Sequence, residues 1–272
     1  MEKFFLETTS GKIAVKQTRS DGFPVVLIHG NSLSSLTFEN QINSAELEEF
    51  RLIAPDLPGH GDSGKSIDPE NVYSPLNFIR VIVELCLKLD AANGILAGHS
   101  LGGHMIISAL KSLPEVNGAL VFGTPPLGVP PRMDLAFQPV PALGLAFKPD
   151  LTEDELMLLA SVFVKPGITP PASIVSSIRA TDPSVRNIVG KALVSGQGND
   201  EAERIRNFGK PFAILHGAED QLVNKDYING FQSDNLWRNT IHSIINAGHT
   251  PQIEQPEVFN SFLLKFLKDI QP

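Results

Sequence analysis

A single serine flanked by glycines is the first feature of this sequence that could carry chemistry. In "GILAGHSLGGHMII" (94–107), an apolar run stops at Ser100, and apolar residues at helical spacing follow it. A strand that turns directly into a helix at Ser100 would project the hydroxyl from a crowded corner, which needs small residues at Gly98 and Gly102. The N-terminus of that helix favours developing negative charge. The pattern therefore predicts that Ser100 is a nucleophile.

A base and an orienting acid for this serine can be found further along the chain. A serine hydroxyl needs a base to take its proton, and a carboxylate usually orients that base. His249 lies in "INAGHTP", directly after the last predicted strand, and Glu219 and Asp220 follow the predicted strand 211–217. We predict Asp220 as the acid because it begins the next loop, with Glu219 as the alternative. The order Ser, Asp, His is a known order for a catalytic triad.

The predicted reaction also needs two donors for the oxyanion. The backbone N–H of Leu101 follows the nucleophile, and "HGNS" after the predicted strand 24–30 places the N–H of Asn31 as the second donor. We predict structural roles in loops or beside the elbow for His29, His60 and His99. The sequence predicts no role in the site for His104, His216 or His242.

Metal and cofactor chemistry is not indicated. Neither the H-x-H-x-D-H nor the H-E-x-x-H spacing occurs in the sequence, so we predict no metal site and no cofactor. The single cysteine, Cys86, lies in the apolar helical pattern "VIVELCLKLD" and is expected to be a buried core thiol. One cysteine allows no disulfide within the chain.

Composition excludes several classes of partner. The chain has 272 residues and a formal net charge of −8, with no run of Lys or Arg. We therefore expect neither a nucleic acid nor an anionic membrane surface as partner, since both attract clustered cations. The N-terminus lacks the pattern of a signal peptide, and no apolar stretch approaches transmembrane length. We expect a cytoplasmic protein with a small-molecule substrate; whether it forms a homodimer is left open.

Strand and helix patterns alternate along most of the chain, which predicts an α/β fold with a mostly parallel, eight-stranded sheet covered on both faces. This alternation of strand and helix patterns stops between residues 130 and 207. We predict that this segment is a helical cap inserted after the sixth strand. Residues 1–129 and 208–272 would then form the core. The expected strands include 3–8, 12–17, 24–30, 118–126, 211–217 and 238–245, and the expected helices include 36–49, 74–90, 152–163, 172–192 and 256–269.

Together, these motifs resemble those of a known family. The whole chain resembles the α/β-hydrolases and, more narrowly, the metal-independent N-acyl homoserine lactonases, which open the lactone ring of bacterial quorum-sensing signals. The resemblance implies that Ser100 is the nucleophile, His249 the base and Asp220 the acid, with Asn31 and Leu101 at the oxyanion positions. The matching segments are "LIHGNS" (27–32), "RLIAPDLPGHGDS" (51–63), "SLGGH" (100–104), "GTPP" (123–126), "NLW" (235–237) and "NAGH" (246–249).

One departure from the lactonase pattern concerns the cap. The cap of such a lactonase contributes a tyrosine to the substrate pocket, whereas Tyr73 and Tyr227, the two tyrosines here, both lie outside 130–207. Phenylalanines could line the pocket instead but cannot donate a hydrogen bond; they are Phe137, Phe147 and Phe163. This departure bears on the substrate and leaves the hydrolytic chemistry intact.

The expected function is that of a serine hydrolase of carboxylic esters or lactones, with an N-acyl homoserine lactone as the leading substrate. Dehalogenases and epoxide hydrolases have related loops but need Asp at the nucleophile position, which Ser100 excludes. Two alternatives remain open. One is a general carboxylesterase or C–C bond hydrolase, and the other is a ligand receptor on a hydrolase fold that turns its ligand over slowly or not at all.

Overall fold

An eight-stranded sheet forms the centre of the molecule, with the strand order β1-β2-β4-β3-β5-β6-β7-β8. The computed structural model describes residues 1–194 and 199–271. β1 pairs antiparallel with β2 and β2 antiparallel with β4, whereas every later pair is parallel, which confirms the predicted α/β sheet. The strands are β1 (Glu2–Thr8), β2 (Gly11–Gln17), β3 (Pro24–Ile28), β4 (Arg51–Pro55), β5 (Ile95–His99), β6 (Gly118–Phe122), β7 (Phe212–Gly217) and β8 (His242–Ile244).

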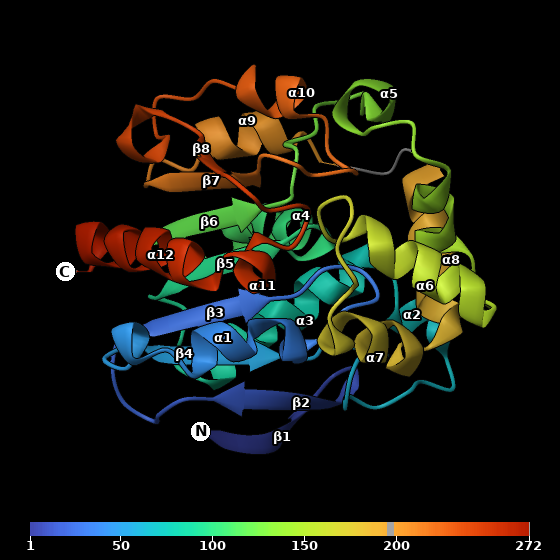
Figure 1. Cartoon of the computed structure of the whole chain (residues 1–272). Coiled ribbons are helices and arrows are strands. Elements are labelled where there is room, and N and C mark those ends of the chain that lie inside the picture. Colours follow the sequence, from blue (N-terminus) through green and yellow to red (C-terminus); the bar gives the residue numbers. More distant parts are fainter. Residues whose placement is uncertain (195–198, 272) are drawn as a thin grey trace.

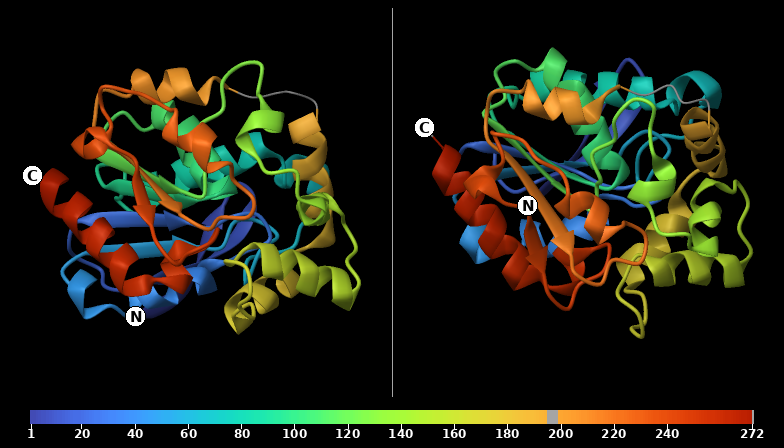
Figure 2. Two further views of the ribbon diagram at one scale, coloured as in Figure 1. Left: turned by 45° about the horizontal axis from the view of Figure 1, so that its top comes forward. Right: turned by 90° about the horizontal axis from the view of Figure 1, so that it is seen from above.

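Helices cover both faces of the sheet and one of its edges (Figures 1 and 2). Within residues 1–194 and 199–271, no helix is both long enough and apolar enough to cross a membrane. The α-helices are α1 (Glu39–Ile42), α2 (Pro69–Val72), α3 (Pro75–Lys88), α4 (Leu101–Ala109), α5 (Met133–Ala136), α6 (Glu153–Val162), α7 (Ala172–Ala180), α8 (Pro183–Val194), α9 (Glu201–Arg206), α10 (Lys225–Asn229), α11 (Pro251–Glu254) and α12 (Pro256–Ile270). The 3₁₀ helices are η1 (Ser35–Phe38), η2 (Ala45–Leu47), η3 (Leu110–Ser112), η4 (Pro141–Phe147) and η5 (Trp237–Asn239).

Alternating residues of the buried strands build two separate cores. In β3, Val26 and Ile28 face a cluster that contains α3 and α4, whereas Val25 and Leu27 face the cluster that contains α12. This follows from the two-residue period of a strand, which sends successive side chains to opposite faces. Cys86 of α3 is fully buried in the first cluster, as predicted, and burial raises the pKa of its thiol to about 12.

The segment between β6 and β7 forms a helical layer beside the carboxyl ends of β3 and β6 (Figure 1). Its helices α6 and α7 share an apolar cluster with Leu33 and Leu222, which belong to loops at the ends of the sheet. Hydrogen bonds reinforce this packing, because Ser34 Oγ meets Ser177 Oγ at 2.7 Å. Of the predicted cap 130–207, residues 195–198 lie outside the described residues.

Two predicted helices are interrupted. The stretch 36–49 contains η1, α1 and η2 instead of one helix, because the chain is extended at Ser44, whose short polar side chain disfavours helix. The stretch 172–192 is divided between α7 and α8. Thr181 is extended, and Pro183 opens the second helix because proline lacks the N–H that a continuous helix would need.

The predicted strand 238–245 is also shorter than expected. β8 covers only His242–Ile244, and the preceding residues form η5. Arg238 and Asn239 have φ values of 55° and 56°, which a strand cannot accommodate. This turn lets the ring of Trp237 pack edge-on against Phe266 of α12 at 5.5 Å.

Candidate active site

Ser100 lies at a sharp turn between β5 and α4. Its backbone has φ 49° and ψ −119°, a conformation that L-residues rarely adopt, and its N–H donates to the carbonyl of Phe122 at 2.9 Å. A Cβ on Gly98 would lie 2.7 Å from the nitrogen of Gly103, and one on Gly102 would overlap the carbonyl oxygens that end β3. Glycine is therefore required where β5, β3 and α4 approach one another, and the crowding holds Ser100 at the corner.

His249 and Asp220 form a buried pair beside this corner. His249 Nδ1 and Asp220 Oδ2 lie 2.8 Å apart, and the two side chains are 1% and 0% exposed. Burial opposes ionisation of Asp220, but the interactions with His249, together with those of His216 and the Val223 N–H, outweigh it, so the carboxyl pKa lies below its ordinary value. The other oxygen, Oδ1, accepts from the backbone N–H of Leu222 at 2.8 Å. Glu219, the alternative acid, is exposed to solvent.

The loop that carries His249 is held from the sheet side and from the cap side. The carbonyl oxygen of His249 lies 2.8 Å from Nε2 of His99, whose pKa burial holds well below its usual range, so neutral His99 donates through Nε2–H. On the cap side, Thr250 Oγ1 donates to the carbonyl of Phe163 at 2.8 Å, and the Phe163 ring stacks on the His249 ring with centroids 5.8 Å apart. These contacts orient the imidazole. Since Nδ1 faces Asp220, Nε2 is the ring nitrogen without a hydrogen bond to any residue within 1–194 and 199–271.

A cavity of about 430 Å³ is lined by both Ser100 and His249. Its wall is mostly apolar and combines side chains of the sheet side with side chains of the cap. The three phenylalanines expected to line a pocket do so; they are Phe137, Phe147 and Phe163. Among the described residues, no Lys or Arg contributes to the wall. The cavity therefore suits a neutral, largely apolar molecule with few polar groups.

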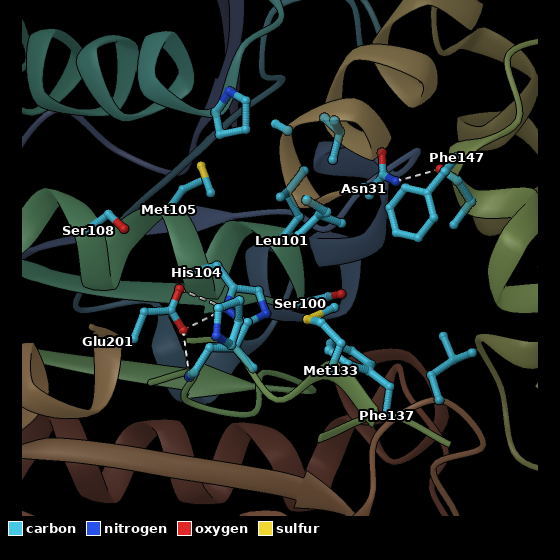
Figure 3. Close-up of a pocket in the computed structure, with 18 of the residues that line it drawn as sticks. Asn31, Ser100, Leu101, His104, Met105, Ser108, Met133, Phe137, Phe147 and Glu201 are labelled. Carbon is cyan, nitrogen blue, oxygen red and sulfur yellow. Dashed lines mark hydrogen bonds and ion pairs between the residues drawn. The ribbon is translucent and has the colours of Figure 1, made fainter. Parts of the chain in front are cut away.

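Asn31 and Leu101 both line this cavity (Figure 3). Leu101 is the first residue of α4, where an N–H has no partner within the helix. Neither the Leu101 nor the Asn31 backbone N–H donates a hydrogen bond to any residue within 1–194 and 199–271. The Asn31 side chain donates instead to the carbonyl of Ala146 at 2.8 Å, which joins the loop after β3 to η4 of the cap. Both backbone donors thus remain available to a ligand.

Three histidines expected to be structural lie in the loops and turns around the site. His29 Nε2 accepts from the Leu57 N–H at 2.9 Å, and His60 Nδ1 lies 3.1 Å from the carbonyl of Pro58. With His99 behind His249, these rings connect the loops at the carboxyl end of the sheet.

Among the polar residues of the cavity that the sequence prediction missed, His104 and Glu201 form a pair. His104 Nδ1 lies 2.9 Å from Glu201 Oε2, and Figure 3 shows both beside Ser100. A signal was present, because a residue four positions after Ser100 in the following helix returns to the same face. Glu201 carried no local signal, since it reaches His104 from α9, 97 residues further along the chain.

Comparison with known proteins agrees with this architecture. The chain is 24% identical over 262 residues to an uncharacterized hydrolase, YugF, of Bacillus subtilis (strain 168), covering 90% of this chain and 89% of that protein. It is 27% identical over 274 residues to a 2-hydroxy-6-oxononadienedioate/2-hydroxy-6-oxononatrienedioate hydrolase of Burkholderia vietnamiensis, covering 96% of this chain and 92% of that protein.

Solved structures extend the similarity to the whole fold. A mutant of the N-acyl homoserine lactonase AidH complexed with N-hexanoyl homoserine lactone superposes with a TM-score of 0.92 at 32% identity, covering 100% of this chain and 99% of that chain. An esterase from Rhodococcus sp. ECU1013 shares the fold, with a TM-score of 0.80 at 23% identity. The match covers 99% of this chain and 100% of that chain. The model of the alpha/beta hydrolase family matches residues 25–262. With its eight-stranded sheet and the serine at the turn after β5, this chain belongs to the alpha/beta hydrolase family.

Proposed function

We propose that this chain is a serine hydrolase of carboxylic esters and lactones, and that N-acyl homoserine lactones are its leading substrates. The observation that carries the proposal is the position of Ser100, held at a strained corner in the same cavity as the buried His249–Asp220 pair. Similarity to the lactonase AidH over the whole chain supports the choice of substrate.

In the proposed mechanism, His249 Nε2 takes the proton of Ser100 as the hydroxyl attacks the substrate carbonyl. Asp220 holds the ring by its Nδ1–H and stabilises the imidazolium. The N–H groups of Asn31 and Leu101 stabilise the oxyanion. His249 then gives its proton to the leaving alkoxide, and a water activated by the same nitrogen hydrolyses the acyl-enzyme. Each step uses side chains or backbone groups of this chain, so the proposal needs no metal or cofactor.

We propose further that residues 130–207 act as a lid over the core formed by 1–129 and 208–272. The contacts that support this role converge on the site: Phe163 stacks on His249, and Ala146 accepts from Asn31. A lid of this kind excludes water from the acyl-enzyme and supplies the apolar wall against which an acyl chain can lie.

A C–C bond hydrolase is the second candidate, because relatives of that activity align with most of this chain. Their named substrates are dicarboxylates, which would carry two negative charges at neutral pH. A cavity without Lys or Arg among its described lining residues offers no countercharge for a second carboxylate. The site therefore favours neutral esters and lactones.

The test compares N-hexanoyl homoserine lactone with p-nitrophenyl hexanoate and weighs the products. Lactone opening adds one water to the intact molecule, whereas amide cleavage would release free homoserine lactone. Dialysis against a chelator is the control and should leave the rate unchanged, since the described residues contain no cluster suited to a metal ion. A kcat/KM for lactones ~10³-fold or more below that for the simple ester, a difference of ~4 kcal/mol, would leave only the esterase. Single or very slow turnover of every substrate would indicate the receptor alternative.

A further inference from the structure

The cavity contains a second histidine–carboxylate pair that the proposed mechanism does not use. His104 Nδ1 lies 2.9 Å from Glu201 Oε2, and the side chains are 14% and 9% exposed. Glu201 is itself anchored, because its Oε2 also accepts from the N–H of Leu127 at 3.0 Å. The carboxylate therefore holds the His104 ring by one nitrogen and fixes the direction of the other.

The second nitrogen, Nε2 of His104, is open to the cavity. It makes no hydrogen bond with any residue in the described ranges, and it is not among the polar atoms that are both buried and without a partner. The atom is therefore accessible. In the neutral ring, with Nδ1–H donated to the Glu201 carboxylate, Nε2 of His104 presents a lone pair. In a mostly apolar cavity, a ligand that supplies a donor at this point gains a hydrogen bond that a purely apolar ligand leaves unmade.

The spacing of His104 and Ser100 along the helix follows from the helical rise. Ser100 caps α4, and His104 lies one turn later, about 6 Å along the axis at 1.5 Å per residue. Met105 and Ser108 continue the same face and also line the cavity; Figure 3 shows them on one side of Ser100, with Asn31 and Phe147 on the other. A substrate chain that leaves Ser100 along α4 passes His104 after about one helical turn.

We infer that His104 is a specificity-determining residue, which accepts a hydrogen bond from a hydroxyl group on the part of the substrate that passes one helical turn beyond Ser100. The inference rests on the proposed function for its substrate class. In an extended N-acyl homoserine lactone, a hydroxyl at position 3 of the acyl chain lies six bonds from the lactone carbonyl carbon, about 7 Å away, a span comparable with one turn of α4. A 3-oxo group at the same place only accepts hydrogen bonds, so it gains nothing from a lone pair at Nε2.

The experiment measures kcat/KM for N-hexanoyl, N-(3-hydroxyhexanoyl) and N-(3-oxohexanoyl) homoserine lactones. We expect the hydroxyl compound to exceed both others by about 5- to 10-fold, the usual effect of one hydrogen bond. His104→Leu should reduce this preference to near one. Ser108→Ala, the matched control one turn further along α4, should retain the preference. A merely structural role for His104 would lower all three rates together and leave their ratios unchanged.

A second substrate pair separates this inference from the lactonase proposal. The ethyl esters of N-hexanoylglycine and N-(3-hydroxyhexanoyl)glycine place the hydroxyl the same number of bonds from the reacting carbonyl without a lactone ring. If only this pair is hydrolysed and shows the preference, the lactonase proposal fails and the role of His104 stands. The inference is overturned if the wild-type enzyme shows no preference for the hydroxyl compound in either substrate series. It is also overturned if the wild-type enzyme hydrolyses neither series. Both outcomes hold even if His104→Leu does not fold. An unchanged preference in folded His104→Leu also overturns it.

Discussion

The two histidine–carboxylate pairs of the cavity are similar in bond length and differ in surroundings. The distances are 2.8 Å for His249–Asp220 and 2.9 Å for His104–Glu201. The first pair is almost fully buried, with side chains 1% and 0% exposed, and a phenylalanine stacks on its imidazole where His249 reaches the cavity wall. The second pair is 14% and 9% exposed and faces the cavity. The same pair of functional groups thus occurs twice around one cavity, once almost fully buried and once partly exposed.

This difference separates the roles that the two pairs can take. Burial and the contact with Asp220 fix the His249 ring and leave its Nε2 as the nitrogen for the proposed general base. His104 lies one turn further along α4. Its second ring nitrogen is therefore placed to contact the chain of a substrate and not the reacting atoms. A histidine–carboxylate contact by itself therefore does not identify a catalytic base. Its burial and its position relative to the nucleophile decide the role.

The largest expected effect separates the two histidines directly. Ser100→Ala and His249→Ala should each lower kcat on p-nitrophenyl hexanoate by at least ~10³-fold, because nucleophile and base act as a unit. His104→Leu should cost far less on this substrate, within about 10-fold, since one hydrogen bond or contact is at stake. A fluorophosphonate probe should label wild type and His104→Leu, but not Ser100→Ala. Equal losses for the two histidine variants would contradict the distinction drawn between the pairs.

A smaller effect is expected when each carboxylate is neutralised. Asp220→Asn should preserve folding and lower kcat by ~10²-fold or more, because the imidazole loses the group that orients it and stabilises its charge. Glu201→Gln should change kcat on unsubstituted esters much less. Glu219→Gln is the control next to Asp220 and should be mild, because Glu219 is exposed. The assignment of the acid is wrong if Glu219→Gln proves more damaging than Asp220→Asn.

The smallest expected effect concerns stability in acid. Burial by itself would raise the pKa of Asp220, but its pairing with His249, together with His216 and the Val223 N–H, holds that pKa below its ordinary value of 3.8. A carboxyl with a depressed folded pKa stabilises the protein above its unfolded pKa, and this contribution is lost as the pH falls through the folded pKa. Wild type should therefore have a larger free energy of unfolding than Asp220→Asn at pH 6. This difference between the two proteins should be smaller at pH 3. Urea titrations at both pH values measure this difference, and a gap that widens in acid would contradict the pairing.

The central elements were predictable because their signals are local. The buried runs that became β3, β5, β6 and β7 carry continuous apolar residues, and glycines mark the turn at Ser100. Where the signal depended on distant packing, the prediction was wrong. The apolar residues of 238–245 match a long strand, yet the turn at η5 leaves only His242–Ile244 paired with β7. The break between α7 and α8 was marked locally by Pro183, although the helical spacing on both sides obscured it.

The sequence by itself determined which groups could react and where the chain must turn, because backbone preferences and apolar periodicity depend on near neighbours. The tertiary structure decided which groups meet. Asp220 and Glu219 are adjacent in the chain, but only Asp220 is turned inward to His249. His104 acquired a partner in Glu201 only because α9 packs against α4. Contacts between residues so far apart depend on how helices and loops pack together, and no neighbouring residues encode that packing alone.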